Sequence, residues 1–244
     1  MKNDVVLKMD KVSYRYSDAP KDVYVFKNLS YEFNSGKMYA IKGKSGSGKT
    51  TLLSLISGLE KKYEGKIYFG KNDLSKFNLD KYRNSDIGIV FQSYNLLPHL
   101  TSSENIILSM DINGLKKINK KEKALELLKS VGLGKKHENR RVLKLSGGEQ
   151  QRVAIARSLS YNPKIIIADE PTGNLDKETE REILKIFSNL AHNENKCVII
   201  VTHSEEVCKA CDVVYSLKSK KDLEEEIILK KEENKKNKKS QKKK

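Results

Sequence analysis

Residues 43–50 read GKSGSGKT and stand between an apolar segment at 38–41 and a segment at 49–59 whose apolar residues recur at helical spacing. This is the pattern G-x-x-x-x-G-K-[ST] in its strand–loop–helix context. The glycines allow a tight loop whose backbone N–H groups point at one anion, and the helix that follows adds its dipole. The stretch therefore predicts a phosphate-binding loop at the end of a buried strand in an α/β fold.

Two side chains in this loop carry the chemistry expected of it. The Lys49 ammonium would neutralise the β- and γ-phosphates of a nucleotide, and the Thr50 hydroxyl would ligate Mg²⁺. The alternative, a serine–glycine turn without a ligand, is disfavoured by the strand and helix on either side. The predicted nucleotide-binding residues here are Gly43, Lys44, Ser45, Gly46, Ser47, Gly48, Lys49, Thr50 and Thr51.

The remaining apolar segments complete an α/β pattern. Period-2 stretches between residues 5 and 33 predict antiparallel strands. Buried strands are expected at residues 66–69, 87–91, 164–168, 197–201 and 212–217. Helices are expected at residues 148–160, 177–191 and 204–210. Their alternation with strands indicates a mainly parallel core sheet with helices on its faces.

We expect one domain over residues 1–217 and a charged tail over residues 218–244. About residues 95–143 interrupt the α/β pattern with helical spacing and are predicted to form an inserted α-helical subdomain. The tail is rich in Lys, Glu and Asn, with one apolar patch at 227–229, and is predicted to be disordered with at most a short helix.

The composition of the 244-residue chain disfavours membrane-spanning and secreted proteins. Its unbroken apolar runs, at 165–168 and 197–201, are far shorter than the roughly 20 residues of a transmembrane helix. Residues 1–4 begin no apolar stretch of the kind found in a signal peptide. Cys208 and Cys211 are spaced C-x-x-C but have no second pair to complete a zinc site. With three cysteines in all, the chain is expected to belong to a reducing cytoplasm.

The net charge of +16 is consistent with binding to nucleic acid, but the kinds of basic residue present argue against recognition of a specific base sequence. Only seven of the 48 basic residues are Arg, and Arg is the usual bidentate reader of guanine. Residues 230–244 alone hold nine Lys and two Glu. A Lys-rich surface with a solvated tail is the simpler explanation.

Two acidic residues end the apolar run at 165–168. Asp169 and Glu170 would lie at the carboxyl end of a parallel strand, where α/β sheets bind their ligands. Asp169 is placed to hold Mg²⁺, directly or through water, and Glu170 to polarise an attacking water as general base. A helix cap is the alternative interpretation, and the upstream phosphate loop disfavours it.

Residues 145–150 read LSGGEQ and precede a helix. Ser146 is a good N-cap, and Gly147 and Gly148 leave backbone N–H groups open for a second anion. From the residues alone, a well-capped helix without a ligand is equally consistent.

These three motifs together resemble the ATP-binding cassette of ABC transporters, in the family's order and spacing, over about residues 5–217. The resemblance implies the family's P-loop fold, with an antiparallel β subdomain and an inserted helical subdomain, ATPase activity, and ATP and Mg²⁺ as ligands. Four stretches are similar to exporter-type and mechanotransmission ATPases: IVFQ at 89–92, NLLP at 95–98, QQRVAIAR at 150–157 and DEPTGNLD at 169–176.

The resemblance also implies roles for further residues. Gln92 looks like the Q-loop glutamine and His203 like the switch histidine. Residues 174–176, NLD, look like the D-loop, which makes Asp176 a further implied nucleotide-binding residue. Tyr16 looks like the aromatic that stacks on adenine, with Tyr14 as the alternative. The implied catalytic residues are Glu170, His203, Gln92 and Lys49. The implied metal ligands are Thr50, Gln92 and Asp169. Ser146, Gly147 and Gly148 would contact ATP held by a second copy in a head-to-tail dimer.

The expected protein is an ATPase subunit that powers a separate transmembrane permease, which would hold it at the inner face of the cell membrane. An importer ATPase of the same family is one alternative. A soluble family member acting on nucleic acid is another, disfavoured because Gly43 and Leu145 lie only about 100 residues apart and the chain has one ATPase unit. Intact Glu170 and His203 disfavour an inactive signalling subunit. Residues 140–144, RRVLK, either contact the permease or are simply solvated.

The Lys-rich tail has two interpretations: it is attracted weakly to anionic lipid or to an acidic permease surface, where each Lys near a membrane contributes about 1 kcal/mol, or it is a solubilising tail without a partner. Deletion after Leu229 should lower binding to anionic vesicles at low salt in a cosedimentation assay, and the difference should vanish near about 0.5 M salt. Basal ATPase activity should not change, because every predicted catalytic residue precedes the deletion. Equal vesicle binding would contradict the membrane role and favour a purely solubilising tail, whereas lost activity would show that the tail packs on the catalytic domain.

Overall fold

The computed structural model describes residues 4–20 and 23–218. The predictions for the tail beyond residue 218 therefore lie outside the described residues.

A five-stranded parallel sheet forms the centre of the molecule. Its strands lie in the order β6 (Ile87–Val90), β7 (Ile165–Asp169), β8 (Cys197–Thr202), β3 (Lys37–Lys42) and β9 (Val213–Ser216). Every neighbouring pair is parallel, and β3 and β8 stay in register from Lys37 opposite Cys197 to Lys42 opposite Thr202. The α/β fold with a parallel core sheet is confirmed.

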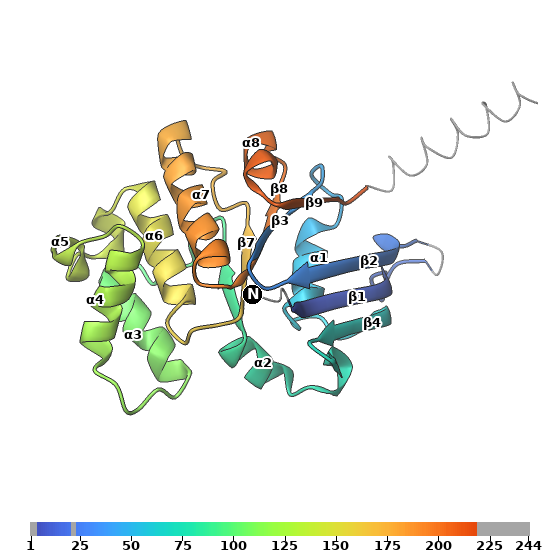
Figure 1. The fold of residues 1–244 in the computed structure, drawn as a ribbon, viewed down its shortest axis with the longest axis horizontal. Coiled ribbons are helices and arrows are strands. Elements are labelled where there is room, and N and C mark those ends of the chain that lie inside the picture. The colour runs from blue at the N-terminus through green and yellow to red at the C-terminus, as the bar shows by residue number, and fades with distance from the viewer. Residues whose placement is uncertain (1–3, 21–22, 219–244) are drawn as a thin grey trace, which may run out of the picture.

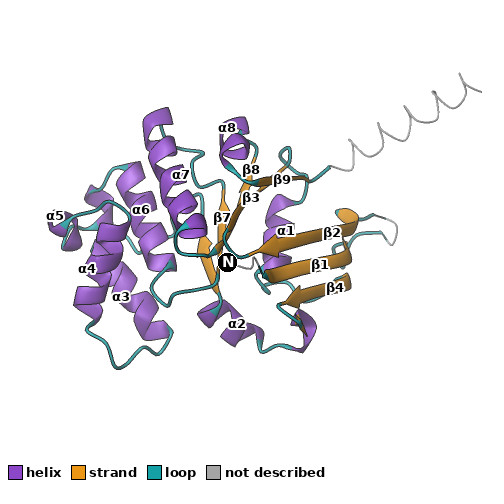
Figure 2. Ribbon diagram, viewed as in Figure 1, coloured by secondary structure: helices purple, strands orange, loops and turns teal. Residues whose placement is uncertain are grey.

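A second, antiparallel sheet lies beside the first. Its strands follow the order β2 (Phe26–Asn34), β1 (Val5–Tyr14), β4 (Glu64–Phe69) and β5 (Asn72–Asp73). Figure 1 shows this sheet and the helices α3 to α6 at opposite ends of the molecule, with the parallel sheet between them. The colouring of Figure 2 makes the division of the strands into two sheets plain.

The helices are α1 (Lys49–Ile56), α2 (Leu79–Ser85), α3 (Ser102–Ile112), α4 (Lys120–Ser130), α5 (Lys135–Glu138), α6 (Gly147–Ser158), α7 (Lys177–His192) and α8 (Glu205–Ala210). Short 3₁₀ turns cover Leu74–Lys76 and Val142–Lys144. Helices α3, α4 and α5 fill most of the region predicted to be a helical insertion, and α3 and α4 pack on α6. None of the described helices is both long and apolar enough to cross a bilayer.

Successive side chains along the strands of the parallel sheet point to opposite faces and pack into two separate apolar cores. Ile165 and Ile167 of β7 point to the side of α1 and the antiparallel sheet, where they join one buried cluster. Ile166 and Ala168 join the other, formed with α3, α4, α6 and α7. Because both faces of these strands are buried, their sequences are continuously apolar rather than alternating.

Several element boundaries differ from the sequence predictions. The helix predicted at residues 49–59 ends at Ile56, because Gly58 adopts a left-handed φ of 71° that breaks the helix, and Leu59 is exposed. The strand predicted at residues 66–69 begins two residues earlier, at Glu64, so that Gly65 lies within β4. Helix α2 was not predicted, although Asn78 caps its first turn by accepting from Lys81 N–H. Cys208 and Cys211 are free thiols at the passage from α8 to β9.

Gly65 allows β4 to pass close to an irregular part of β1. Its φ is +87°, and a Cβ there would lie 2.4 Å from the carbonyl oxygen of Lys11. We expect Gly65→Ala to lower the free energy of unfolding by at least about 2 kcal/mol in urea titrations, from backbone strain and the clash together.

The matched control for Gly65→Ala is Gly70→Ala. Gly70 also has a positive φ, +58°, but a Cβ at this position would meet no atom within 4 Å. It should lose only about 1 kcal/mol, the cost of the backbone conformation alone. Equal losses at the two positions would show that close approach to Lys11 is not what requires glycine.

Candidate nucleotide-binding site

The carboxyl ends of β3, β6, β7 and β8 meet at one edge of the parallel sheet, where they surround a pocket of about 940 Å³. The predicted site residues that line this pocket are Tyr16, Lys44, Ser45, Gly46, Gly48, Lys49, Thr50, Thr51, Gln92, Asp169, Glu170 and His203. Four strands and the loop after β1 thus bring together residues spread over most of the described chain.

The loop at residues 43–50 is shaped by its glycines. Gly46 and Gly48 have φ values of +75° and +91°, which glycine adopts without strain. A Cβ on Gly48 would lie 2.4 Å from the side chain of Val25. Gly43 and Ser47 do not line the pocket but pack on one another beneath it, since a Cβ on Gly43 would lie 2.3 Å from Ser47 Oγ. These two residues support the loop.

Lys49 is held over this loop by the loop's own carbonyl groups. Its Nζ donates to the carbonyl oxygens of Gly43, at 2.8 Å, and Lys44, at 3.1 Å. It also lies 3.9 Å from Glu170 Oε1. The side chain is only 12% exposed, so the ammonium has a fixed position between the loop and the carboxylate.

Glu170 is fixed by residues from the neighbouring strand β8 and the residue after it. Thr202 Oγ1 donates to one carboxylate oxygen at 3.0 Å, and His203 Nδ1 lies 2.7 Å from the other. The backbone of Glu170 is left-handed, with φ +44°, a conformation that costs a residue with a Cβ free energy. Its N–H donates to the carbonyl oxygen of Val201, which holds that conformation against β8.

Asp169 lies deeper at the end of β7. Burial raises the pKa of its carboxyl group, the charge of Glu170 raises it further, and Lys49 opposes both. A bound cation would favour the ionised form in the same way as Lys49 does.

The oxygen atoms around this carboxylate suit Mg²⁺. The Thr50 hydroxyl, the Asp169 carboxylate and the Gln92 amide all line the pocket, and each offers the hard oxygen donor that Mg²⁺ prefers. Among the described residues no group of three or more His, Cys, Asp and Glu side chains forms a complete metal cage. Mg²⁺ ordinarily uses one or two carboxylates together with water and phosphate oxygens, so this set fits it.

The two tyrosines proposed for the adenine have different surroundings. Tyr16 lines the pocket, is 50% exposed, and its hydroxyl lies 2.8 Å from Thr51 Oγ1. Tyr14 is buried beneath it, with the two rings edge to face, and donates to Glu60. Of the two, Tyr16 offers the accessible ring face to a ligand of this pocket.

Some residues of the pocket were not predicted. Ala19, Val23, Tyr24 and Val25 line it from the segment between β1 and β2, part of which the alternating pattern predicts to be strand. Thr202 was missed as well, although it precedes His203 and anchors Glu170. A hydroxyl residue at the end of a buried strand, adjacent to a predicted site residue, was the available signal.

The residues of the LSGGEQ segment lie elsewhere and are absent from the pocket's lining. Ser146 and Glu149 form a reciprocal capping box at the start of α6. Gly148 leaves room for Thr179, whose methyl group would lie 2.4 Å from a Cβ at that position. Asp176 caps α7 by accepting from the N–H of Thr179, so the predicted D-loop and the LSGGEQ segment are neighbours.

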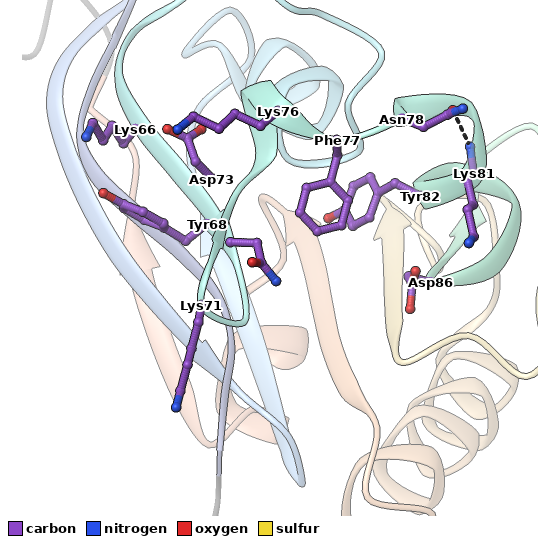
Figure 3. A pocket seen from close by; sticks show the side chains of 11 residues that line it. Lys66, Tyr68, Lys71, Asp73, Lys76, Phe77, Asn78, Lys81, Tyr82 and Asp86 are labelled. Carbon is purple, nitrogen blue, oxygen red and sulfur yellow. Dashed lines mark hydrogen bonds between the residues drawn. The ribbon is translucent and has the colours of Figure 1, made fainter.

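A separate pocket of about 820 Å³ lies between the β4–β5 hairpin and α2. Figure 3 shows the rings of Phe77 and Tyr82 side by side at its centre, with Lys66, Lys71 and Lys76 toward the hairpin and Lys81 on the opposite side. None of the predicted site residues lines this pocket.

Comparison with known proteins gives a consistent result. Residues 26–173 match the family model described as "ABC transporter". The ABC transporter ATP-binding protein YclH of Bacillus subtilis is 45% identical over 85% of this chain and 91% of its own length. The lipoprotein-releasing system ATP-binding protein LolD of Rickettsia felis is 42% identical over 88% of this chain and 96% of its own.

A solved relative is MJ0796 of Methanocaldococcus jannaschii. Its dimeric cassette structure superimposes with a TM-score of 0.78 at 37% identity, covering 87% of this chain and 94% of that one. A second dimeric structure of MJ0796, in a post-hydrolysis state bound to ADP and Pi, also gives a TM-score of 0.78, at 35% identity, covering 88% and 96% of the two chains.

Lys49→Ala should remove most nucleotide affinity, because it deletes the ammonium group held over the loop by Gly43 and Lys44. Titration calorimetry with ATP would measure the loss. Lys61→Ala, which removes the same charge outside the pocket, should bind ATP as the parent does. Unchanged affinity in Lys49→Ala would contradict the assignment of the phosphate loop.

Proposed function

The chain belongs to the ABC transporter family as an ATP-binding protein, and from this premise we propose that it hydrolyses ATP to power a separate membrane permease. Its fold is that of an ABC ATPase cassette. The observation that carries the proposal is the placement of Glu170 against Lys49 and His203 at the wall of the phosphate-loop pocket.

The residues of one chain supply most of the hydrolytic site. The loop at residues 43–50 and Lys49 bind the phosphates, and Tyr16 offers its ring to the adenine. Glu170 accepts the proton of the attacking water as general base, while Thr202 and His203 hold its carboxylate in place. Mg²⁺, held by Thr50, Asp169 and Gln92, would neutralise phosphate charge.

A second copy of the chain would complete the site. Ser146, Gly147 and Gly148 present a capped helix N-terminus outside the pocket, where no nucleotide of the same chain is expected. In a head-to-tail pair, each LSGGEQ segment would face the ATP of the other chain. The dimeric structures of MJ0796, one with ADP and Pi, support this arrangement. Closing around ATP would exclude water and convert binding into movement of a partner.

The partner we propose is an exporter-type or mechanotransmission permease in a separate chain. The similarity to LolD, an ATP-binding protein of a lipoprotein-releasing system, supports this type over an importer. Through that permease the chain would work at the cytoplasmic face of the membrane. Copurification with a membrane protein encoded beside it would test the partnership.

Glu170→Gln tests the hydrolytic role. The amide keeps the size and hydrogen bonding of the side chain but cannot take a proton, so ATP should still bind while turnover falls by roughly 10²–10⁴-fold. The trapped ATP should hold a dimer that sedimentation velocity detects. Glu122→Gln, at an exposed position of α4, is the control and should behave as the parent. A monomeric Glu170→Gln protein with ATP and Mg²⁺, or one with parental turnover, would rule out the assigned role.

A further inference from the structure

His137 is a buried histidine far along the chain from every predicted catalytic residue of the pocket. It lies on the short helix α5, and its side chain is only 6% exposed. Its Nε2 lies 3.2 Å from Glu149 Oε1, on the first turn of α6. A buried ring nitrogen facing a carboxylate of the LSGGEQ segment has no part in the mechanism described above.

An ionised carboxylate can only accept, so the contact between Nε2 and Glu149 Oε1 needs a hydrogen on Nε2, which donates to the carboxylate. Nδ1 lies 3.1 Å from the backbone nitrogen of Gly134 and 3.2 Å from its carbonyl oxygen. The ring thereby links the start of α5 to the start of α6.

Glu149 is in turn hydrogen-bonded to Ser146. Its other oxygen, Oε2, accepts from the backbone N–H of Ser146 at 2.8 Å, and Ser146 Oγ accepts from the backbone N–H of Glu149 at 3.2 Å. The pKa of Glu149 lies below its usual value, chiefly because Ser146 N–H donates to it, so the carboxylate stays ionised. The hydroxyl of Ser146 is used as an acceptor, which leaves its own hydrogen available to a phosphate oxygen.

The hydrogen bond from His137 fixes the orientation of the Glu149 carboxylate, which the capping box alone would leave free. The terminal torsion of a Glu side chain is soft, so one hydrogen bond at one oxygen does not hold the carboxylate plane. Donors at both oxygens, Nε2 of His137 and N–H of Ser146, do hold it. The carboxylate is also a negative charge at a helix end offered to phosphate, and a donor on its far side offsets that charge.

We propose that His137 is a positioning residue for ATP held by a second copy of the chain: through Glu149 it sets the orientation of Ser146 at the dimer-facing end of α6. This inference rests on the proposed function, because it needs the ATP-dependent dimer. It predicts a separation of two properties. Capture of ATP by the phosphate loop does not depend on His137, whereas association of two ATP-loaded chains does.

The test uses the full chain in the Glu170→Gln background, in which the ATP-bound dimer should accumulate. His137→Leu removes both ring nitrogens and keeps an apolar side chain in the buried site. ATP affinity of the monomer, from calorimetry at low protein concentration, should stay within about twofold of the parent, while the dimer dissociation constant from sedimentation should rise about tenfold. His137→Gln, whose amide nitrogen can donate to Glu149, should restore most of the dimer.

Glu149→Ala provides an independent arm, because it removes the carboxylate from a partly exposed position and leaves the buried ring unchanged. It should weaken the dimer at least as much as His137→Leu does, and adding His137→Leu to it should change the dissociation constant by less than about twofold. Additive losses would show that His137 acts without Glu149 and would overturn the proposal. So would parental dimerisation of His137→Leu, or equal losses in the Leu and Gln variants.

If the Glu170→Gln parent stays monomeric with ATP, the dimer of the proposed function is refuted and the role of His137 falls with it. If the parent dimerises and the His137 variants match it, only the role of His137 is refuted.

Discussion

The site depends on the parallel, in-register pairing of β3, β7 and β8. Because these strands run in the same direction, the phosphate loop after β3, the acidic pair at the end of β7 and His203 after β8 emerge at one edge. A shift of one residue in β8 would exchange the two buried faces of that strand and carry Thr202 away from Glu170. The sheet therefore sets the distances within the site as well as the fold.

The sequence was sufficient for the fold and for most of the pocket because the decisive signals are local. The glycine-rich loop directly follows one apolar run, and the acidic pair directly follows a second apolar run. Both motifs are therefore predicted to lie at the ends of strands. Tyr16 could be separated from Tyr14 only in three dimensions, where one ring is accessible and the other lies buried beneath it. The contact of Val25 with the phosphate loop was not predictable for the same reason, whereas the position of Thr202 beside His203 was a signal, although its contact with Glu170 on the neighbouring strand was not.

Boundaries were less predictable than elements. Gly58 ends α1 earlier than its apolar spacing indicates, whereas Gly65 continues a strand although glycine usually interrupts one. Both glycines have a positive φ, which the residue type allows. The residue type does not show whether that backbone ends an element or lies within one. The consequence comes from the neighbours: Leu79 and Tyr82 stand beside Gly58, and the backbone of Lys11 crosses Gly65.

The left-handed backbone of Glu170 places this position under two opposed selective pressures. A glycine there would relieve backbone strain of about 1 kcal/mol, but it would also give up the contacts of the carboxylate with Thr202, His203 and Lys49. Selection for turnover favours the carboxylate that Thr202 and His203 hold. In a lineage that lost the need for hydrolysis, only these structural contacts of the carboxylate would still oppose relief of the backbone strain at residue 170.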